Sequence, residues 1–141
     1  MLKNYLSRSI ACVAFLFAVS ASADFYVVTN PDNKEPIDIE SAKSLFNGAK
    51  TQWGNGKKVL LVMPELDTPD GEAALKDIYG FSREKYKKFW LTKVYRAEAA
   101  APPETKSPDA IKAFLKSYPD AVSVLSSDQI DATVRKAFKL E

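Results

Sequence analysis

The residues best placed to bind a ligand or do chemistry follow the most apolar run of the mature part of the chain. Residues 59–63, with the sequence VLLVM, lead into a polar loop at residues 64–70, and we expect a helix to start near Gly71. In α/β proteins ligands bind where a strand feeds a loop and a helix N-terminus, because the first helical N–H groups have no partner within the helix. The hydroxyl of Thr68, the carboxyl of Asp70 and the backbone of Gly71 are therefore candidate ligand-binding groups.

Two other expected strands also end in short polar residues. Thr29 and Asn30 end the first strand, and Ser126 and Ser127 follow the strand expected at residues 121–125. We expect these strand ends to line the same crevice as the central loop. The predicted site is lined by Thr29, Asn30, Thr68, Asp70, Gly71, Ser126 and Ser127.

The residue types present exclude several kinds of catalysis. The chain has no histidine, and its one cysteine, Cys12, lies in the N-terminal apolar run. Serine–histidine and cysteine–histidine catalysis and ordinary zinc sites are therefore excluded. Asp67 and Asp70 could act as an acid and a base if their pKa values were pushed apart, but two acids in one polar loop are usually only solvated. We expect a protein that is not an enzyme and that has no metal and no cofactor.

The N-terminus has the order of a secretory signal peptide. Lys3 and Arg8 precede an apolar run at residues 9–20, and the small residues Ala-Ser-Ala at 21–23 form a cleavage site. The apolar run is shorter than the about 20 residues that a membrane-spanning helix needs. We expect cleavage after Ala23, a periplasmic mature protein, and no transmembrane segment in the mature chain.

The mature chain has no excess of charge of either sign. Removing 23 leader residues from 141 leaves 118 residues, with 18 basic residues, because Lys3 and Arg8 are lost from 20, and 18 acidic residues. A net charge of zero gives no argument for nucleic-acid binding. The length suits one domain, residues 24–141, with a single core.

The apolar patterns predict an α/β domain. Strands are expected at residues 25–29, 59–63 and 121–125, and helices after Asp38, Asp70, Ser82 and Ser107. Residues 134–140 would form a last strand or a short helix, and we favour a strand at the end of this segment. Residues 97–106 form a loop inside the domain. We expect a single three-layer-like domain in which helices flank a mixed sheet.

The helix after Ser82 has two alternative interpretations. Tyr86, Phe89 and Trp90, with Leu91 and Val94, form a wide apolar stripe, and Arg83, Lys85, Lys87 and Lys88 lie on the same helix. The stripe would pack on the sheet or would bind a partner, and the basic residues would be solvated. Trp53 and Trp90 are expected to be structural.

Several short motifs resemble those of the substrate-binding proteins of phosphate ABC transporters. They are Asn30-Pro31, the run FNGAK at 46–50 followed by Trp53 and Gly56, the strand at 59–63, Phe89-Trp90, Pro102-Pro103, and YPDAV at 118–122. The resemblance implies a truncated form of the type 2 periplasmic-binding fold. It also implies that the partner is a small solute or oxyanion.

The loop that would hold the oxyanion departs from the family pattern. The family places arginine and a serine–glycine–threonine run there, whereas this loop has only the Thr68 hydroxyl. Four carboxylates surround it: Glu65, Asp67, Asp70 and Glu72. Near the C-terminus, Ser123 stands where the family usually has glycine, and the chain is less than half of a two-lobed binder.

Two functions therefore compete. The first is a non-enzymatic, exported periplasmic binding module with a degenerate anion site. The second is a protein–protein interaction module in a cell-envelope assembly, which has lost small-ligand binding and uses an envelope protein as its partner. The aromatic and basic helix would form that contact.

We predict that the chain is exported and cleaved after Ala23, because its N-terminus combines positive charge, an apolar run and small residues. Mass spectrometry of the mature protein should place Asp24 at the N-terminus. Retention of residues 1–23 on a protein recovered from the cytoplasm would contradict export.

Overall fold

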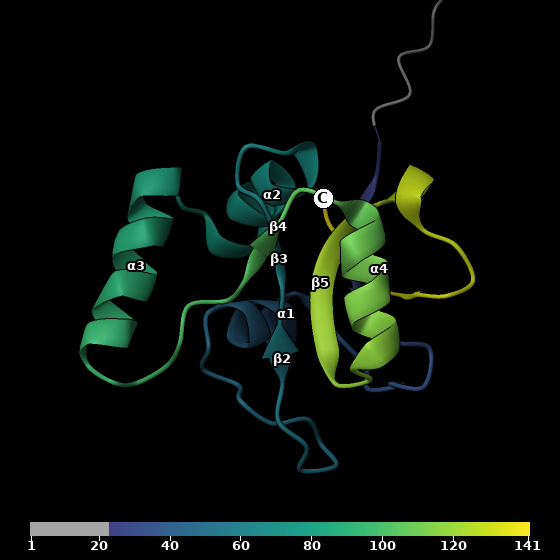
Figure 1. Cartoon of the computed structure of the whole chain (residues 1–141), viewed down its shortest axis with the longest axis horizontal. Helices are drawn as coiled ribbons and strands as arrows, with labels where there is room; N and C mark the ends of the chain where they lie inside the picture. Colours follow the sequence, from purple (N-terminus) through teal and green to yellow (C-terminus); the bar gives the residue numbers. More distant parts are fainter. Residues whose placement is uncertain (1–22) are drawn as a thin grey trace, which may run out of the picture.

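The computed structural model describes residues 23–141, so the expected signal peptide lies almost entirely outside the described residues. Figure 1 shows the arrangement of the elements. They are β1 (Phe25–Thr29), α1 (Ile39–Phe46), β2 (Leu60–Leu61), β3 (Met63–Pro64), α2 (Pro69–Ala74), the π-helix η1 (Leu75–Tyr79), α3 (Arg83–Tyr95), β4 (Glu104–Thr105), α4 (Pro108–Ser117), β5 (Ala121–Ser126), the 3₁₀-helix η2 (Ser127–Gln129) and β6 (Arg135–Lys139).

The main sheet is mixed and has the strand order β2-β5-β1-β6. β1 is antiparallel to both β5 and β6, while β2 is parallel to β5. The register pairs Phe25 with Ser126 and Thr29 with Val122. The expected α/β class with a mixed sheet is confirmed, and so are the first strand and the final one.

The apolar run at residues 59–63 lies between two neighbouring strands. The Val62 N–H donates to the Val122 carbonyl of β5 (3.1 Å), and the Met63 N–H donates to the Pro103 carbonyl beside β4 (2.9 Å). Successive N–H groups of a strand point to opposite sides, so one extended segment bonds to both neighbours. The strand expected here is confirmed as an extended segment, although its regular part is divided into β2 and β3.

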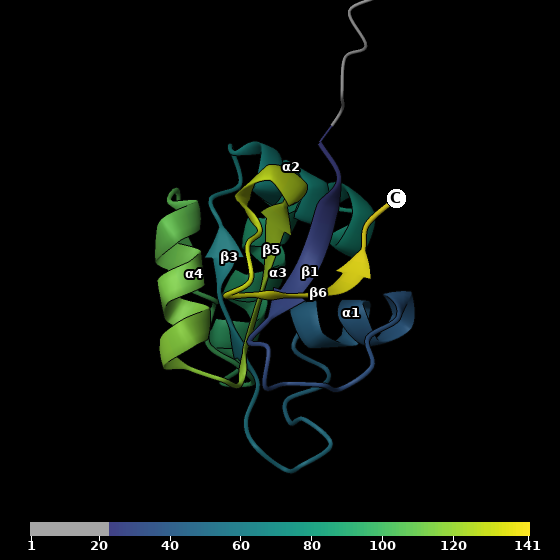
Figure 2. The ribbon, with the colours of Figure 1, turned by 90° about the vertical axis from the view of Figure 1, so that its right-hand side faces the viewer.

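The core lies on both faces of the sheet because neighbouring residues of a strand point to opposite faces. Val27 packs in a cluster with residues of α1, α2, η1 and α3, whereas Val28 packs with Ile111 and Leu115 of α4. Figure 2 shows α4 and α1 on opposite sides of β1. The expected three layers are confirmed.

Side-chain caps start three of the helices where the sequence predicts. Asp38 and Ser41 form a capping box at α1, in which the Ser41 N–H donates to Asp38 Oδ1 (2.8 Å). Ser82 caps α3, and Ser107, followed by Pro108, caps α4. These residues pair helical N–H groups that would otherwise be left without partners.

The expected loop at residues 97–106 contains a strand that the sequence did not indicate. Glu104 and Thr105 form β4, which runs parallel to β3. Neither residue belongs to an apolar alternating run, so their strand conformation depends on the pairing with Met63 and Pro64. The segment still lies within the domain, as expected.

The apolar stripe of α3 packs only in part. Tyr86 and Trp90 are buried and Phe89 is half-buried, but Leu91 and Val94 are 69% and 47% exposed. The stripe expected to cover the sheet is therefore narrower than the sequence indicated. Within residues 23–141, no helix is both long enough and apolar enough to cross a membrane.

We expect Trp90→Ala to lower the free energy of unfolding by about 3–5 kcal/mol, because it empties a core position. Trp90 is 5% exposed and lies edge-on to both Tyr86 and Phe89. Leu91→Ala is the matched control on the next residue and should change stability by no more than about 0.5 kcal/mol. Denaturant unfolding followed by circular dichroism measures both. Equal effects of the two substitutions would contradict a core role for Trp90.

Candidate functional site

Thr68 is the N-cap of α2. Its Oγ1 accepts a hydrogen bond from the Gly71 N–H (3.1 Å) and donates one to the Glu65 carbonyl (2.6 Å). Pro69 follows at the first helical position, where its fixed φ suits the helix. The helix therefore begins two residues before Gly71, and the hydroxyl predicted to bind a ligand already has a donor and an acceptor inside the protein.

Gly71 lets the first turn of α2 pack directly on the loop before it. A Cβ at this position would lie 2.1 Å from the Glu65 carbonyl oxygen, so only glycine fits. The N–H groups of Gly71 and Glu72 both donate to Thr68, the second to its carbonyl at 2.9 Å. The predicted donors at this helix start are thus paired within the chain.

Asp70 and Ser126 come together, as the sequence predicted. Both are buried, at 8% and 7% exposure. Burial raises the pKa of the Asp70 carboxyl, the charge of nearby Asp128 raises it further, and hydrogen bonding from Ser126 acts in the opposite direction. This part of the candidate site therefore contains a buried acid whose charged form is disfavoured.

Lys106 neutralises part of the negative charge of the loop. Its Nζ lies 3.5 Å from Glu65 Oε2 and 3.7 Å from Asp67 Oδ2. The pKa of Lys106 is raised by the charges of Asp67 and Glu65. Asp67 is thus paired with an exposed lysine while Asp70 faces Ser126, so the two acids considered for acid–base chemistry have different partners.

Ser127 follows Ser126 at the start of η2. Its N–H donates to the Asp24 carbonyl at 2.7 Å, which joins the start of the described domain to the end of β5. Ser127 therefore lies next to Ser126 and close to the Asp70 end of the sheet, but its backbone donor is paired within the protein.

Thr29 and Asn30 lie at the opposite end of the sheet from Ser126. Because β1 and β5 are antiparallel, Ser126 pairs with Phe25, four residues from Thr29, or about 13 Å along the strand. The Asn30 side chain donates to the Leu115 carbonyl (3.0 Å) and accepts from the N–H that follows two residues later. The expectation that all seven residues line one crevice is wrong, since strand orientation separates two of them.

Sequence reasoning missed a polar cleft at the Thr29 end. The cleft has a volume of about 370 Å³. It is lined by Asp32, Asn33, Lys34, Glu35, Trp53, Gly54, Asn55, Lys57, Pro119 and Asp120. These residues come from three separate loops, and no sequence pattern indicated that the three loops meet.

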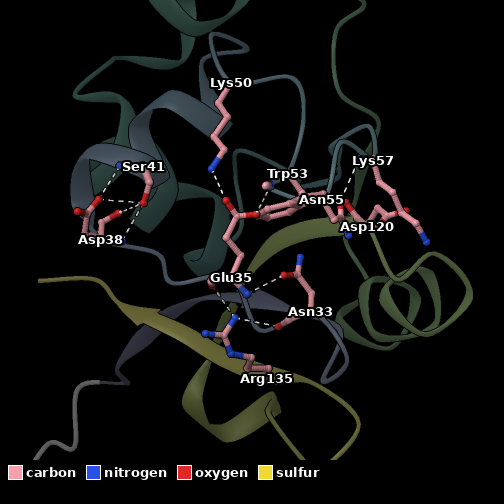
Figure 3. A network of polar contacts seen from close by, with 11 residues as sticks. Asn33, Glu35, Asp38, Ser41, Lys50, Trp53, Asn55, Lys57, Asp120 and Arg135 are labelled. Atoms are coloured by element: carbon pink, nitrogen blue, oxygen red, sulfur yellow. Dashed lines mark hydrogen bonds and ion pairs between the residues drawn. The ribbon is translucent and has the colours of Figure 1, made fainter.

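Glu35 fixes the shape of this polar cleft (Figure 3). Its carboxylate accepts from Lys50 Nζ (2.6 Å) and from the Gly54 N–H (2.9 Å), and Arg135 donates to its backbone carbonyl (3.0 Å). Burial acts to raise the pKa of Glu35, but hydrogen bonds from Lys50 and Gly54 hold it below its usual value. Trp53, 4% exposed, donates to the Asp120 carbonyl, which confirms its structural role.

Comparison with known proteins shows which solved structures share the fold of this chain. No protein-family model and no curated protein matches the chain. An ABC-type phosphate transport receptor from Vibrio cholerae is similar in structure, with a TM-score of 0.63 and 15% identity over 80% of this chain and 44% of that one. A structure from Clostridium perfringens, described as a phosphate ABC transporter substrate-binding protein with bound phosphate, gives 0.64 and 16% over 82% and 44%. PstS from Borrelia burgdorferi gives 0.55 and 13% over 74% and 41%.

These likenesses confirm the resemblance in fold that the sequence motifs indicated. The chain has the α/β fold found in the substrate-binding proteins of phosphate ABC transporters. It spans less than half of the length of those proteins. Identities of 13–16% carry the fold and not the ligand.

We expect Gly71→Ala to destabilise the protein by about 1–3 kcal/mol or more, because the new methyl group meets backbone that has no room to move. Gly54→Ala is the matched control, since its Cβ would meet only the Glu35 side chain at 3.6 Å. Thermal unfolding of both variants measures the difference. If Gly71→Ala unfolded at the temperature of the unchanged protein, α2 would not pack on the Glu65 carbonyl as described.

Proposed function

We propose that this protein is a non-enzymatic, exported periplasmic binding module in which the anion site is degenerate. The fold shared with phosphate-binding proteins supports a solute-binding module. The hydrogen bonds at the start of α2 support the loss of high-affinity oxyanion binding. Any solute that the module holds would contact the edge formed by Thr68, Asp70, Gly71, Ser126 and Ser127.

The observation that carries this proposal is the internal pairing of Thr68 and Gly71. A strong oxyanion site needs donors that stay unpaired until the ligand arrives, such as helix N–H groups, hydroxyls and arginine forks. Here the Thr68 hydroxyl donates to the Glu65 carbonyl, and the Gly71 N–H donates to Thr68. Phosphate would have to break these bonds to use the same donors.

The carboxylates around the start of α2 also oppose the binding of phosphate. Asp70 is buried in the first turn of α2, and Glu65 and Asp67 stand in the loop before it. Two like charges about 4 Å apart repel each other by roughly 4 kcal/mol at an effective dielectric constant of about 20. An unpaired carboxylate at that distance would outweigh the about 1.5–3 kcal/mol gained from one hydrogen bond to a charged group.

A second candidate is the protein–protein interaction module in a cell-envelope assembly. The exposed outer side of α3 favours it, since Leu91, Val94 and Tyr95 are 69%, 47% and 91% exposed. The two functions differ in what they require of the α2 edge, the group of residues Thr68, Asp70, Gly71, Ser126 and Ser127 at the start of α2 and the end of β5. The binding module needs a solute there, whereas the interaction module needs only a stable domain that presents α3.

We predict that phosphate binds with a dissociation constant no better than about 1 mM, or roughly −4 kcal/mol. Isothermal calorimetry at neutral pH measures it on the unchanged protein, on Thr68→Ala, and on Ser82→Ala as a matched cap variant. Ser82 caps α3 in the way that Thr68 caps α2, but it lies outside the candidate site. Micromolar binding that Thr68→Ala abolishes and Ser82→Ala retains would contradict the degenerate site.

A further inference from the structure

The charges of the mature sequence are unevenly distributed. Between residues 83 and 96 there are six basic residues and one acidic residue, while the rest of residues 24–141 holds twelve basic and seventeen acidic residues. The overall charge of zero therefore conceals one strongly cationic helix, α3, on an acidic body. Figure 1 shows α3 at one side of the molecule, across the domain from α4.

The outer side of α3 combines these cations with exposed apolar groups. Leu91, Val94 and Tyr95 are three of the four large apolar side chains that are exposed among the described residues. Lys87 lies one turn before Leu91 and two turns before Val94 and Tyr95, so these residues share a side of the helix. Tyr86 and Trp90, one residue earlier in each turn, face the core instead.

The cations of α3 differ in how far they are already engaged. Arg83 pairs with Glu72 at 2.9 Å, and Lys93 lies 3.7 Å from Glu98 and over the ring of Phe89. Lys87 and Lys88 are exposed and form no ion pair among the described residues. Lys85, which lies over the ring of Phe81, and the exposed Arg96 form no ion pair there either. Lys87 and Lys88 are the two unpaired cations that lie one turn before Leu91 on the helix.

We propose that the outer side of α3 docks on the surface of an anionic phospholipid bilayer. Lys87 and Lys88 would contact lipid phosphates, while Leu91, Val94 and Tyr95 would enter the boundary between headgroups and acyl chains. Binding of a helix to a membrane surface strengthens with the apolar area that it buries and with electrostatic attraction to anionic lipids, and the outer side of α3 offers both. Long lysine side chains can reach the headgroups while their methylene groups stay with the apolar residues.

The composition of α3 favours lipid over an acidic protein as the occupant. The centres of protein interfaces are depleted in lysine and enriched in arginine and aromatic residues. Four of the six cations between residues 83 and 96 are lysines, and the large aromatic residues Tyr86 and Trp90 are buried in the core. The exposed large apolar side chains there are two aliphatic residues and one tyrosine, and lysines outnumber arginines around them.

Sedimentation with vesicles tests this proposal. The protein purified from the producing cells is mixed with vesicles of phosphatidylcholine alone or with phosphatidylglycerol added, and the extra binding to the anionic vesicles is measured. We expect this extra binding to fall as salt is raised, because screening weakens exposed charge pairs. Every variant shares the same N-terminus, so differences between variants report on the folded domain.

Two matched double substitutions locate the contact. Lys87→Glu/Lys88→Glu should lower the extra binding at least ten-fold, whereas Lys57→Glu/Lys58→Glu changes the net charge equally on an exposed loop and should lower it less than two-fold. Leu91→Ser/Tyr95→Ser keeps the charge and should also weaken binding. Circular dichroism confirms that each variant folds.

Three results would overturn the proposal. They are no extra binding to anionic vesicles, equal losses in the two charge-reversed variants, and a photo-crosslinker at residue 91 that reacts in intact cells with a protein and not with lipid. The last result would assign α3 to an acidic protein partner. Binding of free inorganic phosphate at the start of α2 plays no part in these measurements, so their outcome is independent of the degenerate anion site.

Discussion

The antiparallel pairing of β1 with β5 determines how the rest of the domain is arranged. It forms the centre of the main sheet, and the neighbouring residues Val27 and Val28 supply the two core clusters on its opposite faces. Because the two strands are antiparallel, the segments that follow β1 and β5 also leave the sheet at opposite ends of these strands. As a result the polar groups of the chain form two separate regions, the α2 edge near Ser126 and the polar cleft near Glu35.

At the α2 edge, helix capping and anion binding compete for the same groups. A threonine hydroxyl and an early helical N–H can hold an oxyanion or can pair with each other. Gly71 packs closely on the Glu65 carbonyl, and this contact keeps the Thr68 hydroxyl within hydrogen-bond distance of the Glu65 carbonyl and the Gly71 N–H. Thr68 therefore pairs with both groups. The loop before α2 is thus a compact structural turn with the buried Asp70 carboxyl beside it.

Sequence reasoning recovered the elements that depend on local chemistry. The caps at Asp38, Ser82 and Ser107 and the strand at residues 25–29 follow from side-chain hydrogen bonding and apolar patterning, and the structure confirms them.

Sequence reasoning failed for features that depend on pairing between distant segments of the chain. The orientation of β1 against β5, the strand at residues 104–105 and the cleft around Glu35 have no local signal, because each depends on segments far apart in the chain. The exposure of Leu91 and Val94 was missed because an apolar stripe does not say how much of it another element will cover.

Amide hydrogen exchange at Gly71 and Glu72 tests most directly whether the α2 start is closed by internal hydrogen bonds. Both N–H groups donate to Thr68 in the structure. The account predicts that these two amides exchange slowly in the absence of any ligand and that millimolar phosphate leaves their rates unchanged. Rapid exchange without phosphate, followed by strong protection when phosphate is added, would mean that the donors are free to bind an anion and would contradict it.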